Sequence, residues 1–190
     1  MGKVVVTEFV SLDGVMEDPG GAEGYEHGGW TFKFDRGADG DKFKMDELLA
    51  ADAQLLGRRT YEGFARAWPS IEDEAGFADK MNSMPKFVVS KTLKSADWTN
   101  STVLDGDLVT DVGGLKERFA GNILVAGSRQ LVQGLLRHDL VDELRLMVFP
   151  VTLGRGKRLF EDGSELRRFE LVRAAQLADV AVLELRRARV

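Results

Sequence analysis

The sequence contains no cysteine and only two histidines, His27 and His138. Without cysteine the chain has no disulfide, no thiolate nucleophile and no cysteine–zinc site, and it suits a reducing compartment, which we expect to be the cytoplasm. Two histidines are too few for a multi-histidine site, so we expect no metal. No apolar run approaches the roughly 20 residues that cross a bilayer, and residues 1–10 lack the pattern of a signal peptide, so we expect no membrane partner.

An excess of positive charge is also missing. Lysine and arginine number 26 against 31 acidic residues, which gives a formal net charge of −5 and argues against nucleic acid as the main partner. Hydrophobic residues make up 44% and charged residues 30% of the 190 positions, an ordinary globular balance. This length, with no repeat or linker, predicts one domain over residues 1–190.

Apolar, β-branched segments alternate with helical patterns along the chain. Strands are expected at 3–10, 53–56, 86–90, 102–104, 122–126, 144–150, 169–174 and 180–186. Helices are expected at 41–51, 60–67, 77–84, 109–119 and 128–136. This order predicts an α/β fold with a mainly parallel central sheet, helices on both faces and an antiparallel hairpin at the C-terminal edge. The glycine-rich stretch 15–40 is expected to be a long loop that is either functional or mobile.

Two places share one local design, in which an apolar strand meets a glycine and then a helix start. They are QLLGRRT at 54–60, around Gly57, and ILVAGSR at 123–129, around Gly127. A helix start offers free amide groups and the positive end of a dipole, which together favour phosphate. Two such starts on one parallel sheet suit the two ends of a dinucleotide.

The residues beside the first glycine sharpen this interpretation. Arg58 and Arg59 offer planar forks of donors, and the 2′-phosphate of an adenosine ribose is their natural target, which favours NADPH over NADH. Ser90 and Lys91, at the end of the 86–90 strand, would add a hydroxyl and a cation there. However, strand–glycine–helix turns occur throughout α/β proteins, and G-x-G-x-x-G does not follow the first strand. The spacing alone therefore leaves nucleotide binding and ordinary connecting turns as equal alternatives.

Further candidates lie at the end of the first strand and in the loop after it. Asp13, in the SLDG turn, would hydrogen-bond a substrate ring or relay a proton through water; Asp-Gly is equally a common turn pair. His27 is a candidate proton donor, although a single loop histidine is more often solvated. The basic turn 154–158 would close over an anionic group or simply face solvent.

Two helices carry residues that suit a substrate pocket. Asp46 and Glu47 lie on the 41–51 helix, where carboxylates usually face solvent. Tyr61, Phe64 and Trp68 follow at helical spacing and would form the floor for a flat substrate, although core packing is the commoner use of such a stripe.

At these motifs the chain resembles the dihydrofolate-reductase-like proteins that include the reductase domain of bacterial riboflavin biosynthesis. Stand-alone members of this group are usually called dihydrofolate reductase family proteins. The matching stretches are VVVTEFVSLDG at 4–14, HGGW at 27–30, LLGRRTY at 55–61, MNSMPKFVVSKTL at 81–93, ILVAGSRQLVQGLL at 123–136 and LVDELRLMVFPVTLGRGKRLF at 140–160.

The resemblance implies the dihydrofolate-reductase-like fold and NADPH as cofactor. It places Gly57, Arg58, Arg59 and Thr60 at the adenosine phosphate, with Ser90 and Lys91 as the second contact there. It also implies a pyrophosphate loop, formed by Ala126, Gly127, Ser128 and Leu131. The residues it sets near substrate or nicotinamide are Asp13, Trp30, Phe64 and Phe149. Many members of the group form homodimers.

The reaction implied is hydride transfer from NADPH to a small heterocyclic or carbonyl substrate, best exemplified by 5-amino-6-(5-phosphoribosylamino)uracil reductase. Val15 follows SLDG where that reductase often carries a basic or polar residue for a phosphorylated sugar, so recognition of the sugar phosphate is in question. Asp13 and Glu47 both remain candidates for the carboxylate that orients a pterin. The alternatives are a pterin or other small-carbonyl reductase and an NADPH-binding sensor without turnover.

Overall fold

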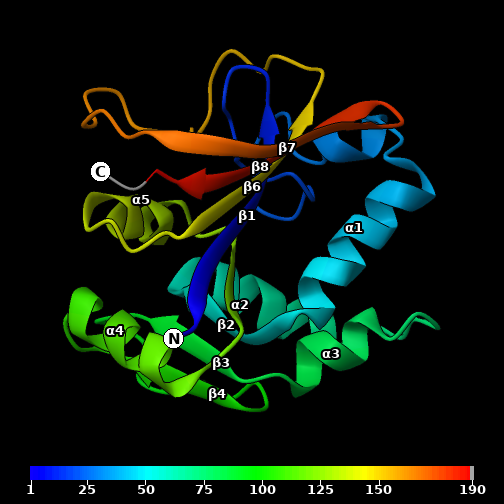
Figure 1. The fold of residues 1–190 in the computed structure, drawn as a ribbon. Helices are drawn as coiled ribbons and strands as arrows, with labels where there is room; N and C mark the ends of the chain where they lie inside the picture. Colours follow the sequence, from blue (N-terminus) through cyan, green and yellow to red (C-terminus); the bar gives the residue numbers. More distant parts are fainter. Residues whose placement is uncertain (189–190) are drawn as a thin grey trace.

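The computed structural model describes residues 1–188. Its strands are β1 (Lys3–Ser11), β2 (Ala51–Gly57), β3 (Lys86–Val89), β4 (Ser101–Leu104), β5 (Asn122–Ala126), β6 (Glu143–Phe149), β7 (Phe169–Leu177) and β8 (Val180–Arg187). Its helices are α1 (Gly37–Leu49), α2 (Arg58–Ala67), α3 (Phe77–Ser83), α4 (Leu108–Arg118) and α5 (Arg129–Arg137), with short 3₁₀ turns at Trp30–Lys33 and Trp68–Ser70. Figure 1 shows how these elements surround a single twisted sheet.

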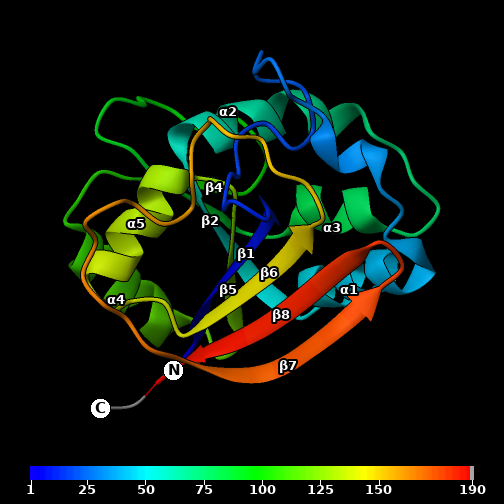
Figure 2. The same cartoon turned by 90° about the horizontal axis from the view of Figure 1, so that it is seen from above.

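The sheet has eight strands in the order β4-β3-β2-β5-β1-β6-β8-β7. β1 lies at its centre, parallel to β5 on one side and to β6 on the other. β2, β3 and β4 extend the parallel part, whereas β7 and β8 form an antiparallel hairpin beyond β6. Figure 2 shows this hairpin at the edge of the sheet. The expected mixed sheet with an antiparallel C-terminal edge is confirmed.

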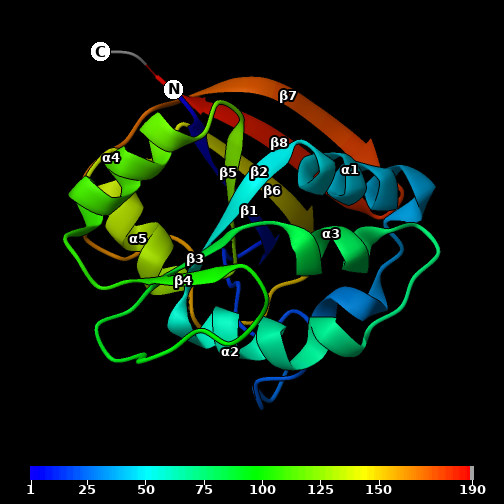
Figure 3. The same cartoon turned by 90° about the horizontal axis from the view of Figure 1, so that it is seen from below.

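Helices cover both faces of the sheet, as the alternation of apolar segments predicts. Figure 3 shows α4 and α5 on one side of the strands and α1 and α3 on the other. Val4 and Val6 of β1 belong to the core under α4 and α5, while Val5 packs with residues of α1, α2 and α3. Successive side chains of a strand point to opposite faces, so an apolar run of this kind is typical of a strand covered on both sides.

The loop after β1 packs on the sheet instead of standing away from it. Asp18 is buried, and its carboxylate accepts hydrogen bonds from the amides of Ala22 and Tyr25. Trp30 is fully buried and donates its indole hydrogen to the carbonyl of Glu17. Trp30 packs against apolar side chains of β6 and β8, including Phe149 and Val182, and so holds the glycine-rich stretch over these strands.

Most helix boundaries lie one to four residues from the expectation; α2, for example, begins at Arg58 rather than at 60, and Ala51, expected at the end of a helix, begins β2. α1 begins at Gly37, four residues before the predicted start at 41, because Asp35 accepts the Gly37 amide and provides a turn that the pattern did not show. α5 begins at Arg129 rather than at 128, because Ser128 has a left-handed backbone, with φ of 63°. Within residues 1–188 no helix combines the length and the apolar character needed to cross a membrane.

Candidate functional site

The two strand–glycine–helix turns meet at the carboxyl end of the sheet. The Gly57 amide donates a hydrogen bond of 2.8 Å to the Ser128 hydroxyl. Gly127 lies against Thr60, and a β-carbon on Gly127 would stand 3.1 Å from the Thr60 side chain. β2 and β5 are parallel neighbours, so their carboxyl ends emerge side by side. The starts of α2 and α5 therefore border one surface.

The charges at these two helix starts distinguish them from the other helices. α1, α3 and α4 each carry an aspartate in the first turn, as expected beside the positive end of a helix dipole. α2 and α5 carry none; α2 begins with Arg58 and Arg59, and α5 begins with Arg129. Neither helix has a side-chain cap, so their first amides are left to a ligand or to solvent. This arrangement suits a bound anion.

The remaining residues of the second turn have structural roles. Ala126 ends β5 opposite Thr7 of β1. Gly127 has φ of 63°, in the left-handed region that favours glycine. Leu131 is buried in the core under α5, so it anchors the helix start and does not present a surface to a ligand. The turn is held from the sheet side by Glu8, whose carboxyl oxygen accepts the Gly127 amide over 3.1 Å.

Of four side chains predicted to contact the adenosine phosphate, the two arginines are exposed, whereas the serine and the lysine make hydrogen bonds within the fold. Arg58 and Arg59 are exposed, and Arg58 approaches Glu62 only at 3.8 Å. Ser90 is buried, and its hydroxyl accepts the amides of Thr92 and Leu93. The Lys91 ammonium donates to the Gly106 carbonyl over 2.7 Å and also to that of Asp105. In this structure Ser90 and Lys91 thus stabilise their own turns, and their contact with a cofactor stays a prediction.

Asp13 is tied to the segment that follows β6. Its carboxylate accepts hydrogen bonds from the Ser11 hydroxyl at 2.6 Å and from the amides of Leu153 and Gly154 at 3.1 and 2.8 Å. Burial alone would raise the pKa of Asp13, but these hydrogen bonds outweigh it, so the pKa lies below its usual value. Asp13 is therefore ionised at neutral pH. The geometry favours an anchoring role, and its catalytic role stays a prediction.

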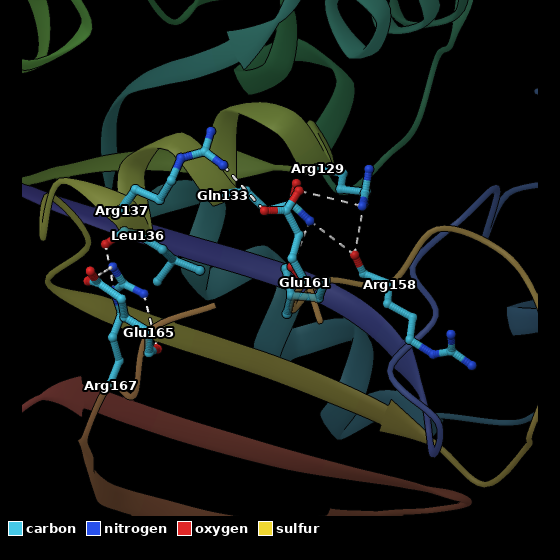
Figure 4. Close-up of polar contacts among 9 residues, drawn as sticks. Arg129, Gln133, Leu136, Arg137, Arg158, Glu161, Glu165 and Arg167 are labelled. Carbon is cyan, nitrogen blue, oxygen red and sulfur yellow. Dashed lines mark hydrogen bonds and ion pairs between the residues drawn. The ribbon is translucent and has the colours of Figure 1, made fainter. Parts of the chain in front are cut away.

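The basic turn 154–158 lies beside Asp13. Arg158 donates its Nε hydrogen to the Asp13 carbonyl, and its guanidinium stands 3.9 Å from the Asp13 carboxylate. Figure 4 shows how α5 holds the same segment: Arg129 donates to the Arg158 carbonyl over 2.9 Å and lies 3.7 Å from Glu161. An open hollow of about 430 Å³ lies here and includes Arg129 and Arg158 in its lining. The turn thus brings cations to the start of α5.

The aromatic residues predicted near a substrate are packed against one another. Trp30 and Phe149 meet edge to face, with ring centroids 5.3 Å apart, and both are buried. Phe9 and Phe34 pack on Phe149 in the same way. Phe64, on α2, lies apart from this group and is half-buried against Trp68 of the following 3₁₀ turn. Contact of Trp30 and Phe149 with substrate requires the loop that carries Trp30 to move, and it stays a prediction.

Glu47, the other substrate candidate, belongs to a buried ionic cluster beneath α1. Its Oε2 accepts from the Thr7 hydroxyl at 2.9 Å and from the Lys44 ammonium at 2.6 Å. Its Oε1 has no hydrogen-bond partner, and the Arg145 guanidinium stands 3.7 Å away. The sequence pattern does not indicate Thr7, Lys44 and Arg145, because they come from three separate elements.

One further hollow lies away from these groups. It has a volume of about 830 Å³ and lies between α2 and the 93–99 segment, with Tyr61 and Trp98 in its lining. The Tyr61 hydroxyl and the Asn82 side chain are used within the fold, since the hydroxyl accepts the Trp98 amide and Asn82 accepts the Trp98 indole hydrogen. Its size therefore does not make it the better candidate, and the paired helix starts remain the site with chemistry suited to a ligand.

Residues 2–183 match the model of the RibD C-terminal domain. The chain belongs to the RibD C-terminal domain family. This assignment confirms the resemblance to the reductase domain of riboflavin biosynthesis.

Relatives and solved structures agree with this assignment. The uncharacterized Bacillus subtilis (strain 168) proteins YyaP and YwjB are each 27% identical, and cover 90% and 98% of this chain and 86% and 98% of their own lengths. A Shewanella sp. PV-4 protein assigned to riboflavin biosynthesis superimposes with a TM-score of 0.78 at 21% identity, over 98% of this chain and 99% of that chain. Acinetobacter baumannii RibD gives 0.65 at 18% identity, over 100% of this chain but 59% of that chain. The structures show the shared dihydrofolate-reductase-like fold.

Proposed function

We propose that this RibD C-terminal domain protein is an NADPH-dependent reductase that binds the dinucleotide across the starts of α2 and α5. The observation that carries the proposal is the contact between Gly57 and Ser128, which sets two uncapped, arginine-bearing helix starts side by side. An arginine at a helix start is unfavourable beside the positive end of the dipole unless an anion is bound there. NADPH carries a 2′-phosphate and a pyrophosphate, which would give each helix start an anionic group to bind.

The residues present fit this cofactor. Exposed Arg58 and Arg59 would bind a 2′-phosphate, because each guanidinium offers several donors in one plane. The pyrophosphate would bind at the start of α5, where Gly127 has a left-handed backbone and Ser128 is the last residue before the helix. Bound NADPH supplies the hydride; the protein's part is to fix its position and to keep the reacting groups in line.

For the substrate we propose a phosphorylated ribosylaminopyrimidine or a compound of the same shape and charge. The Thermotoga maritima structure, which matches 98% of this chain with a TM-score of 0.64, belongs to a 5-amino-6-(5-phosphoribosylamino)uracil reductase joined to a deaminase. Val15, after the SLDG turn, is fully buried and offers no charge to a substrate. It pairs with Arg158 across an isolated β-bridge, so Arg158 brings a cation to the same place from the other segment.

Binding is tested first, without any substrate. Isothermal titration calorimetry of the purified protein with NADPH and then NADH should give saturable binding, tighter for NADPH. Absence of heat with both nucleotides, confirmed by unchanged NADPH fluorescence, would overturn the proposed function. Adenosine 2′,5′-bisphosphate is a useful third ligand, because it carries the adenosine phosphates and lacks the nicotinamide.

Turnover is tested second, by following the loss of NADPH absorbance with a panel of substrates. The phosphoribosylaminopyrimidine should be reduced, and the same compound without its phosphate should be reduced less well if Arg158 contacts that phosphate. Reduction of a pterin in place of the pyrimidine would favour the pterin reductase alternative. Tight NADPH binding with no oxidation across the panel would instead indicate a sensor.

A further inference from the structure

Glu8 is a carboxylic residue in a place where carboxylates are rare. It lies in the middle strand of the sheet, one position beyond Thr7, which pairs with Ala126 of β5. Val6 and Val10, two positions to either side, belong to the core under α5. Because alternate residues of a strand share a face, Glu8 also points to the side of α5. Its side chain is buried and therefore has no access to bulk water.

The contacts of Glu8 are few and specific. Oε2 accepts the Gly127 amide at 3.1 Å, and Oε1 has no hydrogen-bond partner. No cation is paired with it within residues 1–188. The charged groups that act on Glu8 are Lys44 and Glu47 of α1. Both contact the Thr7 hydroxyl, which points to the opposite face of the sheet from Glu8. A carboxyl group held this way directly underlies the turn proposed to receive the pyrophosphate.

Burial without a paired cation disfavours the ionised form. Loss of hydration is the largest influence and raises the pKa of Glu8 well above its usual value, against the smaller opposing effects of the Gly127 amide and of Lys44. Glu47 acts in the same direction as burial. A neutral carboxyl group can accept the Gly127 amide without placing a negative charge behind the turn.

We propose that Glu8 is a positioning residue for the dinucleotide: its neutral carboxyl group holds the Gly127 amide, and its ionisation weakens binding at residues 126–128. This inference rests on the proposed cofactor site. An ionised Glu8 and the bound pyrophosphate would be two negative charges close together in a medium of low polarity, where they repel strongly. Protonation of Glu8 therefore favours binding of the pyrophosphate, and bound pyrophosphate favours the protonated form of Glu8. Glu8 touches neither substrate nor the transferred hydride and acts through Gly127.

The test is the pH dependence of dinucleotide affinity in the wild type and in Glu8→Gln. NADH is the first probe, because it carries the same pyrophosphate without a 2′-phosphate that titrates near pH 6. Above the pKa of Glu8 in the free protein, the Kd of the wild type should rise by up to about tenfold per pH unit, because binding then requires uptake of one proton. In Glu8→Gln that rise should be absent, so the ratio of the two Kd values should increase with pH.

A matched control removes a carboxylate elsewhere in the sheet. Glu170→Gln deletes the partner of Arg186 at the exposed edge strand β7, and its pH profile should follow that of the wild type. NADPH should show the same dependence on Glu8 above pH 7 as NADH, because the two share the pyrophosphate. A larger effect on NADPH alone would place the influence of Glu8 at the 2′-phosphate and overturn the inference.

The outcomes separate the two proposals. No binding of either nucleotide at any pH overturns the proposed function, and with it this inference. Binding with identical pH profiles in the wild type and Glu8→Gln overturns the inference and leaves the proposed function standing. If Glu8→Gln does not fold, infrared difference spectroscopy of the wild type with and without NADH replaces it. A carboxylic acid C=O band that changes on binding supports the proposal, and a spectrum without one at neutral pH overturns it.

Discussion

Gly127 and Thr60 stand so close that a β-carbon on residue 127 would lie 3.1 Å from both Cγ2 and Oγ1 of the threonine. Gly127 also has φ of 63°, which costs a residue with a side chain about 1–2 kcal/mol. The two turns therefore fit together because residue 127 has no side chain.

Gly127→Ala should consequently separate the two helix starts. We expect a loss of about 1–2 kcal/mol in the free energy of unfolding, measured by urea denaturation, from the left-handed backbone alone. NADPH affinity should fall as well, because the alanine must displace Thr60. Thr60→Ser in the same background removes Cγ2 and should restore part of the affinity and little of the stability. Full affinity in Gly127→Ala would show that the turns need not touch.

Arg58→Ala tests which phosphate the first turn binds. Removal of one charge-assisted hydrogen bond should weaken NADPH by about 1–3 kcal/mol and leave NADH nearly unchanged, as measured by calorimetry. Arg66→Ala is the control, because Arg66 is exposed at the other end of the same helix. Equal weakening of the two nucleotides would mean that Arg58 does not distinguish them.

Asp13 should contribute to stability above its pKa. Its folded-state pKa lies below the ordinary value of 3.8, so the unfolded chain takes up the proton first as the pH falls. The stabilisation is complete above pH 3.8 and is lost as the pH falls through that value and then through the lower folded-state pKa. Denaturation curves between pH 2 and 6 should show a smaller acid-induced loss in Asp13→Asn than in the wild type. Parallel curves would contradict the anchoring role.

Trp30→Ala should be the most damaging substitution in the loop after β1. The indole is fully buried against Phe149 and donates a hydrogen bond to Glu17, and its removal should cost about 3–5 kcal/mol of unfolding free energy. Phe32→Ala, two residues away and 79% exposed, should change stability by less than about 0.5 kcal/mol. Similar effects of the two substitutions would indicate that the loop is not packed on the sheet.

Lys86 carries a buried ammonium group that joins α3 to the start of β3 and β4. Nζ donates to the carbonyls of Asn82, Met84 and Thr99 and lies 4.2 Å from the Trp98 ring centre. Lys86→Met should leave those carbonyls without a hydrogen-bond donor. The free energy of unfolding should fall by about 1–3 kcal/mol, the usual cost of a buried polar group that loses its partner. Lys94→Met, at an exposed position, is the control.

The same lysine predicts a pH effect at the alkaline end. Burial lowers the pKa of Lys86 to about 8, so above that pH the folded chain releases a proton that the unfolded chain keeps up to about pH 10.4. This group should therefore raise the stability as the pH increases across that window. Thermal unfolding at pH 7–10 should show a rise in the wild type that is smaller in Lys86→Met.

The strands and the mixed character of the sheet followed from local pattern, whereas the order of the strands within the sheet was not predicted. KVVVTEFV and NILVA are apolar on both faces, which identifies central strands, and Gly57 and Gly127 each marked a helix start. The position of the two turns followed from the same rule, because parallel neighbours end at one edge of a sheet. What the pattern predicted was thus the backbone of the site.

The partners of individual side chains did not follow. Ser90, Lys91 and Asp13 were expected to face a ligand, and in the structure each binds amides or carbonyls of its own or a distant segment. No sequence pattern pointed to Glu8 as a functional residue, because its hydrogen-bond partner, the Gly127 amide, lies 119 positions later in the chain. Such contacts depend on tertiary packing, which no local period encodes.

The central place of β1 has a consequence for synthesis of the chain. β1 leaves the ribosome well before its two neighbours, β5 and β6, which end only at residues 126 and 149. An apolar strand must therefore remain without its hydrogen-bonding partners until most of the protein has emerged, which is the condition under which nascent chains aggregate. Folding in the cell should accordingly depend on protection of the first eleven residues during translation.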